Sequence, residues 1–209
     1  GTELYTLLNY KEVKLPRLMY YYKYITKQLY YKDWAKYNID NLCNFTGFFP
    51  PLISEVEKFS ALMIDELQYV DIWGCFSTVE NLFKSELKHT IKIRLADIDP
   101  LLHESPWSEA LRGKRVLVIH PFEESIISQY KNREFLFENK CILPEFELKT
   151  IKAVQTLGNL TSEFKNWFEA LDSMKRKIDE TDFDIALIGC GAYSLPLATY
   201  IKKIGKSAI

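Results

Sequence analysis

The chain has 209 residues, 47% of them hydrophobic and 26% charged, and its 27 basic and 28 acidic side chains leave a formal net charge of −1. These values are typical of a globular protein and exclude a disordered chain, a collagen-like repeat and a small disulfide-rich scaffold. The near-neutral charge also gives no support to a nucleic-acid partner, because such proteins usually carry an excess of basic residues.

The first part of the chain is basic and rich in tyrosine. Between residues 10 and 37 seven Lys or Arg side chains stand against two acidic ones. After Pro16, apolar and aromatic side chains recur at helical spacing and predict a helix; they are Leu18, Tyr21, Tyr22, Ile25 and Leu29. Such a helix suits a surface that stacks bases or lies at a membrane interface, or a peripheral helix packed on the main domain or on a second subunit. We favour the packed arrangement and expect that any homo-oligomer forms through this helix.

A loop with Gly47, Pro50 and Pro51 follows and marks a boundary. The sequence therefore predicts a helical segment over residues 1–50 and an α/β domain over 51–209. The pattern Ser54-Glu55-Val56-Glu57 fits a capping box, which predicts a helix from there to about residue 69.

Strand and helix patterns alternate after residue 69. The β-branched run over 115–120 is the strongest predicted strand, and its composition suits a parallel strand covered on both faces. The other strands are expected over 70–74, 90–95, 147–154, 183–188 and 207–209, and the helices over 78–88, 105–111, 121–139, 161–180 and 193–204. This order predicts a three-layer α/β fold with a mostly parallel sheet and helices on both faces, plus an N-terminal helical appendage. The last strand is expected to be an edge strand, or else the native chain continues beyond it.

The scattered cysteines and histidines give no metal motif. Four cysteines form no close pair, which indicates reduced thiols and a cytoplasmic location, and three histidines lack metal-ligand spacing. No run of about 18 apolar residues is present, so neither an integral membrane segment nor a signal peptide is expected.

The loop after the strand predicted over 183–188 is the most informative feature for function. A G-x-G turn between a buried strand and a helix lets backbone approach a phosphate, while the helix N-terminus offers free amide donors. We assign five residues of this loop to substrate binding: Gly189, Gly191, Ala192, Tyr193 and Ser194. The alternative is a tight turn that needs two glycines for packing alone. NAD is not expected, because Ser194 replaces the third glycine of the dinucleotide fingerprint and the acidic ribose partner is missing from the chain.

Two residues are candidates for catalysis. His120 follows the strand over 115–120 at its carboxyl end, where ligands bind in open α/β sheets, and could donate a hydrogen bond to phosphate or act as a base. The alternative for His120 is a structural hydrogen bond. Glu80 follows the strand over 70–74, and its alternative role is a first-turn carboxylate that complements a helix dipole.

The segment Arg94-Leu95-Ala96-Asp97-Ile98-Asp99-Pro100 contains two carboxylates at D-x-D spacing. Such a pair can share Mg²⁺ or Mn²⁺ and neutralise a diphosphate leaving group. We assign Asp97 and Asp99 to a divalent ion and Arg94 to the substrate. The alternatives are a helix cap for Asp97 and a turn residue for Asp99.

Three segments in the same order carry a resemblance to a known family: residues 106–122 (PWSEALRGKRVLVIHPF), 143–146 (LPEF) and 183–193 (FDIALIGCGAY). They resemble a family of bacterial proteins, often encoded in surface-polysaccharide or capsule loci, that looks related to GT-D type glycosyltransferases. The resemblance covers residues from about 55 to the end. It departs from GT-D enzymes at Ser194, where relatives often have Gly, and at Asp97 and Asp99, which only echo the metal-binding Arg-x-Gly-Asp-Gly-Glu setting.

The resemblance implies a Rossmann-like fold that binds a nucleotide-sugar and a glycan acceptor during polysaccharide biosynthesis. It also implies that the native sequence continues after Ile209 with a His-Leu-Gly-Gly-type segment, so that the α/β domain is truncated here. The alternative function is a non-catalytic scaffold or interaction subunit of polysaccharide assembly, with the basic tyrosine-rich helix as its docking surface.

Overall fold

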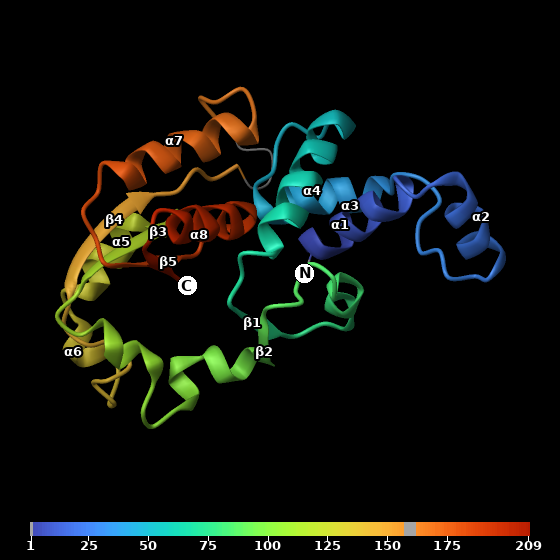
Figure 1. Cartoon of the computed structure of the whole chain (residues 1–209). Coiled ribbons are helices and arrows are strands. Elements are labelled where there is room, and N and C mark those ends of the chain that lie inside the picture. The colour runs from blue at the N-terminus through green and yellow to red at the C-terminus, as the bar shows by residue number, and fades with distance from the viewer. Residues whose placement is uncertain (1, 157–161) are drawn as a thin grey trace.

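The computed structural model describes residues 2–156 and 162–209, which form a mixed α/β fold with parallel strands (Figure 1). The α-helices are α1 (Thr2–Val13), α2 (Arg17–Ile25), α3 (Lys36–Thr46), α4 (Ile53–Leu67), α5 (Glu123–Tyr130), α6 (Arg133–Leu136), α7 (Trp167–Asp179) and α8 (Ser194–Lys203). The strands are β1 (Ile72–Cys75), β2 (Ile91–Arg94), β3 (Arg115–His120), β4 (Glu147–Lys152), β5 (Ile185–Ile188) and β6 (Ser207–Ala208). Short 3₁₀ helices connect them at η1 (Thr78–Phe83), η2 (Leu95–Ile98), η3 (Pro100–Leu102), η4 (Trp107–Leu111) and η6 (Gly191–Tyr193).

The main sheet has four strands in the order β4-β3-β5-β6, and each neighbouring pair is parallel. Its register places Arg115 opposite Glu147, and Val116 opposite Ile185. From β3 the chain moves to β4 on one side and then returns to β5 on the other side. The strand order therefore reverses between β3 and β5, which is the switch point at which open α/β sheets bind ligands.

Helices lie on both faces of this sheet, as expected from the apolar composition of β3. On one face Leu117 and Ile119 join the main core, which includes buried side chains of α7 and α8. On the other face Val116 and Val118 join a smaller cluster with Tyr130 of α5. Alternate side chains of one strand thus enter two separate apolar clusters.

The strands β1 and β2 form a separate parallel sheet, with Ile72 opposite Ile91. The alternation of predicted elements had suggested one continuous sheet. Neither β1 nor β2 has a fully buried residue, so these short strands lack the apolar faces that a place inside the main sheet would bury.

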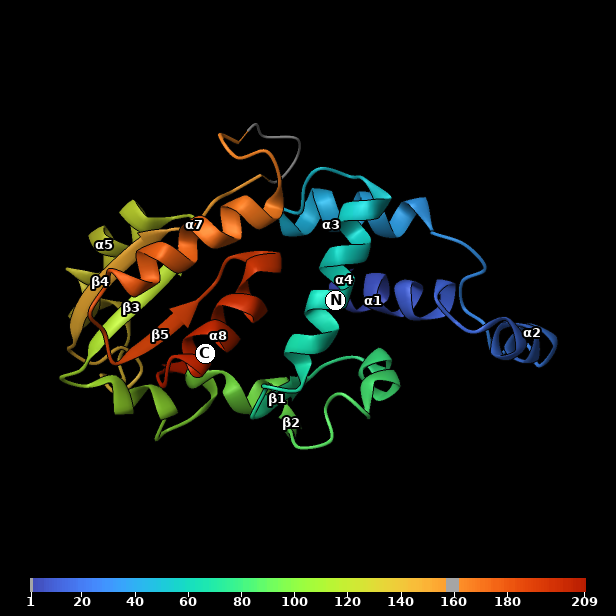
Figure 2. The ribbon, with the colours of Figure 1, turned by 45° about the horizontal axis from the view of Figure 1, so that its top comes forward.

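The N-terminal helices are not a peripheral addition to the fold. Leu7 of α1 and Leu42 of α3 are almost completely buried in the main core, together with Phe59 of α4 and Trp167 of α7. Only α2, which has no buried residue, stands away from the rest of the molecule (Figures 1 and 2). This helix buries no residue against the main domain, whereas its packing on a second subunit and a boundary near residue 50 stay predictions.

Several predicted helices differ from the observed ones. The Ser54 capping box does not form: α4 begins at Ile53, and the carbonyl of Leu52 accepts hydrogen bonds from the first turn. The same S-x-x-E pattern does form a capping box at Ser77 and Glu80, where it opens η1. The helices expected over 78–88 and 105–111 are shorter 3₁₀ helices.

The regions expected to hold helices over 121–139 and 161–180 also differ. The first contains two helices, α5 and α6, separated at Asn132. In the second, α7 begins at Trp167, and the side chain of Asn166 caps it by accepting a hydrogen bond from the Glu169 N–H. Ser162 is thus not the cap, and Thr161 lies outside the described residues. None of the helices described in residues 2–156 and 162–209 is both long and apolar enough to cross a membrane.

Candidate functional site

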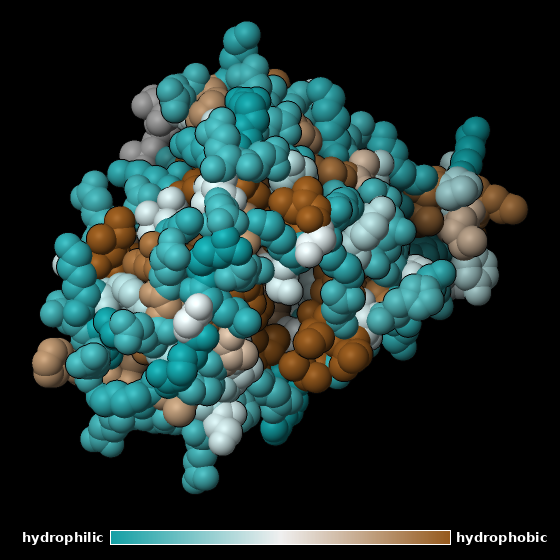
Figure 3. Space-filling view, turned by 60° about the vertical axis from the view of Figure 1, so that its left-hand side comes forward, coloured by the Kyte–Doolittle hydropathy of each residue, from teal (hydrophilic) through white to brown (hydrophobic). Residues whose placement is uncertain are grey.

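A hollow of about 630 Å³ lies against one face of the main sheet and reaches the carboxyl ends of β3 and β5. Val118 and Leu187 contribute to its floor, and residues from the segments 99–111 and 136–143 form its walls. His120, the last residue of β3, and Gly189, directly after β5, line the edge of the hollow at the switch point. The lining is mostly apolar. Figure 3 shows hydrophobic side chains grouped on the surface of one face of the molecule.

His120 is held in one orientation by its own backbone loop. The N–H of Phe122 donates a hydrogen bond of 3.1 Å to Nδ1 of His120, and the two rings lie with their centroids 5.1 Å apart. Because Nδ1 accepts this bond, the neutral imidazole carries its proton on Nε2. His120 therefore presents a hydrogen-bond donor at the hollow, which favours donation to an acceptor over action as a base.

Gly189 makes room for this imidazole. A Cβ atom at position 189 would lie 2.7 Å from Cδ2 and 3.3 Å from Nε2 of His120. These distances are shorter than normal van der Waals contacts, so any larger residue would displace the ring. The sequence predicted separate roles for His120 and Gly189, and the structure brings the two residues into contact.

The other glycine of the loop serves packing. Gly191 has a φ angle of +62°, and a Cβ atom there would lie 2.6 Å from the carbonyl oxygen of Thr46 at the end of α3. The strand-to-helix turn thus sits directly on the backbone of an N-terminal helix. Gly191 therefore matches the alternative given for this loop, in which a glycine is needed for close packing.

The three residues after Gly191 make intramolecular contacts. Ala192 and Tyr193 are buried, and the Tyr193 ring stacks on Trp167 with centroids 5.0 Å apart. The hydroxyl of Ser194 accepts a hydrogen bond of 3.1 Å from the N–H of Cys190. None of these side chains belongs to the lining of the hollow. Their assignment to substrate binding stays a prediction, and in this arrangement it would depend on their backbone N–H groups.

The candidate metal pair is engaged in local contacts. The guanidinium of Arg94 donates to both carboxylate oxygens of Asp97, with 2.6 Å between Nη2 and Oδ1, and the Arg94 N–H donates to Oδ2. The hydrogen bond from the Arg94 side chain is the main cause that lowers the pKa of Asp97 below its usual value. Asp99 accepts a hydrogen bond from the Leu101 N–H at its Oδ1 and caps η3, as a turn residue would.

This arrangement does not fit a divalent ion. Both oxygens of Asp97 already accept hydrogen bonds from Arg94, and of the two carboxylates only Asp99 lines the hollow. In residues 2–156 and 162–209 no group of three or more His, Cys, Asp or Glu side chains is placed to hold a metal. Arg94 is likewise absent from the lining of the hollow, and its side chain is 84% exposed.

Glu80 has a structural role in a different part of the molecule. Its Oε1 accepts hydrogen bonds of 3.0 and 3.1 Å from the N–H groups of Phe76 and Ser77. Burial alone would raise the pKa of this carboxyl, but these donors, together with Cys75 and Trp73, outweigh it and lower the pKa. Glu80 is buried and does not line the hollow, so the first-turn role describes its position better than catalysis does.

Trp107 is a residue of the hollow that the sequence did not single out. Its indole Nε1 donates a hydrogen bond of 2.6 Å to the carbonyl of Ile98 and so fixes the wall that carries Asp99. The adjacent Ser108 hydroxyl donates to the carbonyl of Cys141 on the opposite wall. The only signal in the sequence is the position of Trp107 directly after Pro106, at the start of a short helix.

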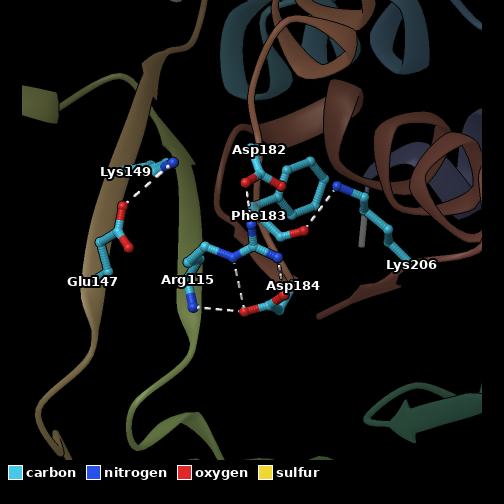
Figure 4. Close-up of polar contacts among 7 residues, drawn as sticks. All are labelled: Arg115, Glu147, Lys149, Asp182, Phe183, Asp184 and Lys206. Carbon is cyan, nitrogen blue, oxygen red and sulfur yellow. Dashed lines mark hydrogen bonds and ion pairs between the residues drawn. The ribbon is translucent and has the colours of Figure 1, made fainter.

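Ion pairs join β3 to the segment before β5 at the amino-terminal ends of these strands, away from the switch point (Figure 4). Arg115 at the start of β3 donates from its guanidinium to Asp182 and Asp184, and its N–H donates to Asp184 at 2.8 Å. The hydrogen bond from the Arg115 side chain is the main cause that holds the pKa of Asp184 well below its usual range. These contacts align β3 with β5 and thereby set the relative positions of His120 and Gly189 at the other end.

The cysteine between the two glycines is not an activated nucleophile. Burial raises the pKa of the Cys190 thiol to about 11, although the Ser194 hydroxyl acts in the opposite direction. The thiol is therefore protonated near neutral pH.

No protein-family model matches the chain, and comparisons with curated proteins and with solved structures find no match either. The geometry of the hollow and the residues at its edge are therefore the features of the chain that indicate a function.

Proposed function

We propose that this chain is a Rossmann-like, three-layer α/β protein that binds a nucleotide-sugar in the hollow at the switch point. On this proposal it acts as a glycosyltransferase-like protein in the cytoplasm during biosynthesis of a bacterial surface polysaccharide. One observation carries the proposal. His120 and Gly189 fit each other at the carboxyl ends of β3 and β5, on the rim of a hollow large enough for a small ligand.

The two parts of the hollow suit two parts of such a ligand. Apolar side chains such as Val118, Leu187 and Trp107 offer a surface on which a flat base can pack. His120 offers an Nε2–H donor to a phosphate or to a sugar hydroxyl. Small-molecule sites commonly combine a mostly apolar lining with few polar groups at fixed positions.

In a glycosyl transfer, the acceptor oxygen bonds to the anomeric carbon and its proton passes to the leaving diphosphate, which departs with the electron pair of the broken C–O bond. Negative charge then develops on the leaving phosphate. A donor already fixed toward that charge stabilises the transition state without reorientation, and His120 is such a donor. Asp97 and Asp99 do not fit a metal ion in this arrangement, so His120 is the group proposed to meet the developing charge.

The proposal is tested by calorimetric titration of the full chain with UDP-sugars and GDP-sugars, each with and without Mn²⁺. We expect saturable binding that does not require Mn²⁺. Absence of binding to every nucleotide-sugar would overturn the proposal. Binding only in the presence of Mn²⁺ would restore the metal role of Asp97 and Asp99 and would overturn the metal-independent geometry.

Three variants locate the binding within the hollow. His120→Ala removes the donor and should weaken binding about tenfold, which is the effect of one good hydrogen bond. His120→Gln restores an N–H donor and should recover part of the affinity. His89→Ala is the matched control, because His89 is exposed and does not line the hollow. Equal affinities for the His120→Ala and His89→Ala proteins would contradict the assigned role.

The non-catalytic scaffold remains the second candidate function. One observation favours it: α2 buries no residue and leaves a helix face free for another molecule. A scaffold should retain partner binding when His120 is replaced and should lose it when the exposed face of α2 is altered. Deletion of the whole N-terminal segment would not discriminate, because Leu7 and Leu42 belong to the main core.

A further inference from the structure

The exposed side of α2 carries a stripe of large apolar and aromatic side chains. Leu18 is 86% exposed and Ile25 is 75% exposed, while Tyr21 and Tyr22 lie between them with about half of their surface exposed. These four residues follow the spacing i, i+3, i+4 and i+7, so they share one helix face. We define them as the α2 stripe. A helix of a globular protein normally turns such a stripe toward the core, but here it faces solvent.

The opposite side of α2 contacts the rest of the chain at two points, through Tyr24 and through Lys23. The rings of Tyr20 and Tyr24 stack with their centroids 6.4 Å apart, and the Lys32 ammonium lies 4.6 Å from the centroid of the Tyr24 ring. Lys23 lies 3.9 Å from the buried carboxylate of Glu12. The helix is thus anchored through this side, and the loop after it turns sharply at Lys27, whose φ angle is +56°. That turn ends the helix before Leu29, which the sequence had placed on it.

Positive charge surrounds the α2 stripe. Residues 13–32 contain no acidic side chain, and α2 has none in its first turn. Arg17 and Lys27 are exposed, and among the described residues neither of them forms an ion pair. Arg17 lies at the start of the helix and Lys27 just after its end, so cations flank the apolar face at both ends.

We propose that α2 docks the chain on an anionic lipid surface, with the stripe inserted at the interface and the flanking cations on the headgroups. Leu18 and Ile25 supply side chains that enter the acyl region, and the tyrosines combine an apolar ring with a polar hydroxyl suited to the headgroup level. Arg17 and Lys27 complement the negative charge of the lipids. Docking of this kind is peripheral and needs no helix that crosses the bilayer.

Two other occupants fit the α2 stripe less well. Its four side chains offer on the order of 500 Å² of exposed surface. A stable protein interface buries roughly 800 Å² per partner, so the stripe is too small to hold a second copy of the chain by itself. Nucleic acid would use the tyrosines for base stacking, but the aliphatic side chains of Leu18 and Ile25 at both ends offer no stacking surface.

The experiment is flotation of the full chain with vesicles of phosphatidylcholine alone and of phosphatidylcholine mixed with phosphatidylglycerol. We expect binding to the anionic vesicles only, and weaker binding at high salt. The double variant Leu18→Ser/Ile25→Ser tests the apolar face, and Arg17→Glu/Lys27→Glu tests the charge; each should reduce binding about tenfold or more.

The matched control for the apolar variant is Phe45→Ser/Phe135→Ser. Phe45 and Phe135 are 69% and 86% exposed, but they lie on α3 and α6. This control should bind anionic vesicles as the unaltered chain does. Because α2 has no buried residue, the altered chains should also keep their circular-dichroism spectra and melting temperatures.

Two outcomes would overturn the proposal. The first is no vesicle binding by the unaltered chain, and the second is binding that the Leu18→Ser/Ile25→Ser substitutions leave unchanged. In the first case, light scattering could show a dimer that these substitutions convert to a monomer. That result would instead support the self-association expected from the sequence. The proposal is independent of the nucleotide-sugar site, because no residue of α2 lines the hollow.

Discussion

Replacement of Gly191 by alanine separates a packing role from a phosphate-binding role for this glycine. The new Cβ atom would lie 2.6 Å from the carbonyl oxygen of Thr46, which belongs to backbone and cannot rotate away. The φ angle of +62° adds the strain of a left-handed conformation. Left-handed alanine costs about 1 kcal/mol and overpacking a further ~2 kcal/mol, so the variant should lose about 3 kcal/mol of unfolding free energy.

The chain contains matched controls for this substitution. Gly113 and Gly205 also have positive φ angles, of +70° and +83°, but a Cβ atom at either position meets nothing within 4 Å. Alanine at these positions should therefore cost about 1 kcal/mol, from backbone strain alone. The difference between Gly191→Ala and the controls isolates the close approach to Thr46.

Urea unfolding followed by circular dichroism measures the effect. With a slope of about 2 kcal/mol per molar urea, the midpoint should fall by roughly 1.5 M for Gly191→Ala and by about 0.5 M for the controls. Equal shifts for all three variants would refute the packing role. A normal midpoint together with lost nucleotide-sugar affinity would show that Gly191 serves the ligand instead.

Three further predictions concern other residues. The depressed pKa of Asp184 means that its bond to Arg115 stabilises the fold above the ordinary aspartate pKa of about 3.9, and that this contribution is lost as the pH falls below it. Asp184→Asn should therefore lower the melting temperature at pH 7, and the difference from the unaltered chain should shrink in acid; a pH-independent difference would contradict this. Glu80→Ala leaves the N–H groups of Phe76 and Ser77 without their acceptor and should cost about 2 kcal/mol in urea unfolding, whereas an unchanged midpoint would argue against the structural role. Cys190 should resist iodoacetamide in the native chain at pH 8 and react after unfolding, as measured by mass spectrometry, because burial raises its pKa to about 11; rapid native alkylation would refute this.

The sequence predicted those elements whose signal is local. The β-branched run over 115–120 marks β3 to the residue, because a strand buried on both faces needs little else to be recognised. The turn from β5 to α8 was also expected, since two glycines interrupt an apolar run. Short 3₁₀ helices such as η1 were expected as longer α-helices, because hydrophobic spacing over a few residues does not distinguish the two.

The features of the candidate site that the sequence did not predict depend on contacts between distant residues. Neither the fit of Gly189 to His120 nor the approach of Gly191 to Thr46 has a signature in either segment alone. For Asp97, the sequence predicted either a metal ligand or a helix cap. In the structure its carboxylate accepts hydrogen bonds from Arg94, three residues earlier. Local spacing identified residues able to carry chemistry, whereas tertiary neighbours determined which of them reach the hollow.

The contact between the Thr46 carbonyl and Gly191 also constrains the order of folding. It joins the end of α3 to the turn before α8, two places far apart in the chain, and the buried side chains around it belong to one core. Helix α3 therefore cannot complete its contacts until the segment around Gly191 has emerged from the ribosome, whereas α1 packs on α3, α4 and η1, which are synthesised early. During synthesis the α1–α3–α4 unit can thus form first, with the end of α3 as the surface on which the late turn before α8 docks.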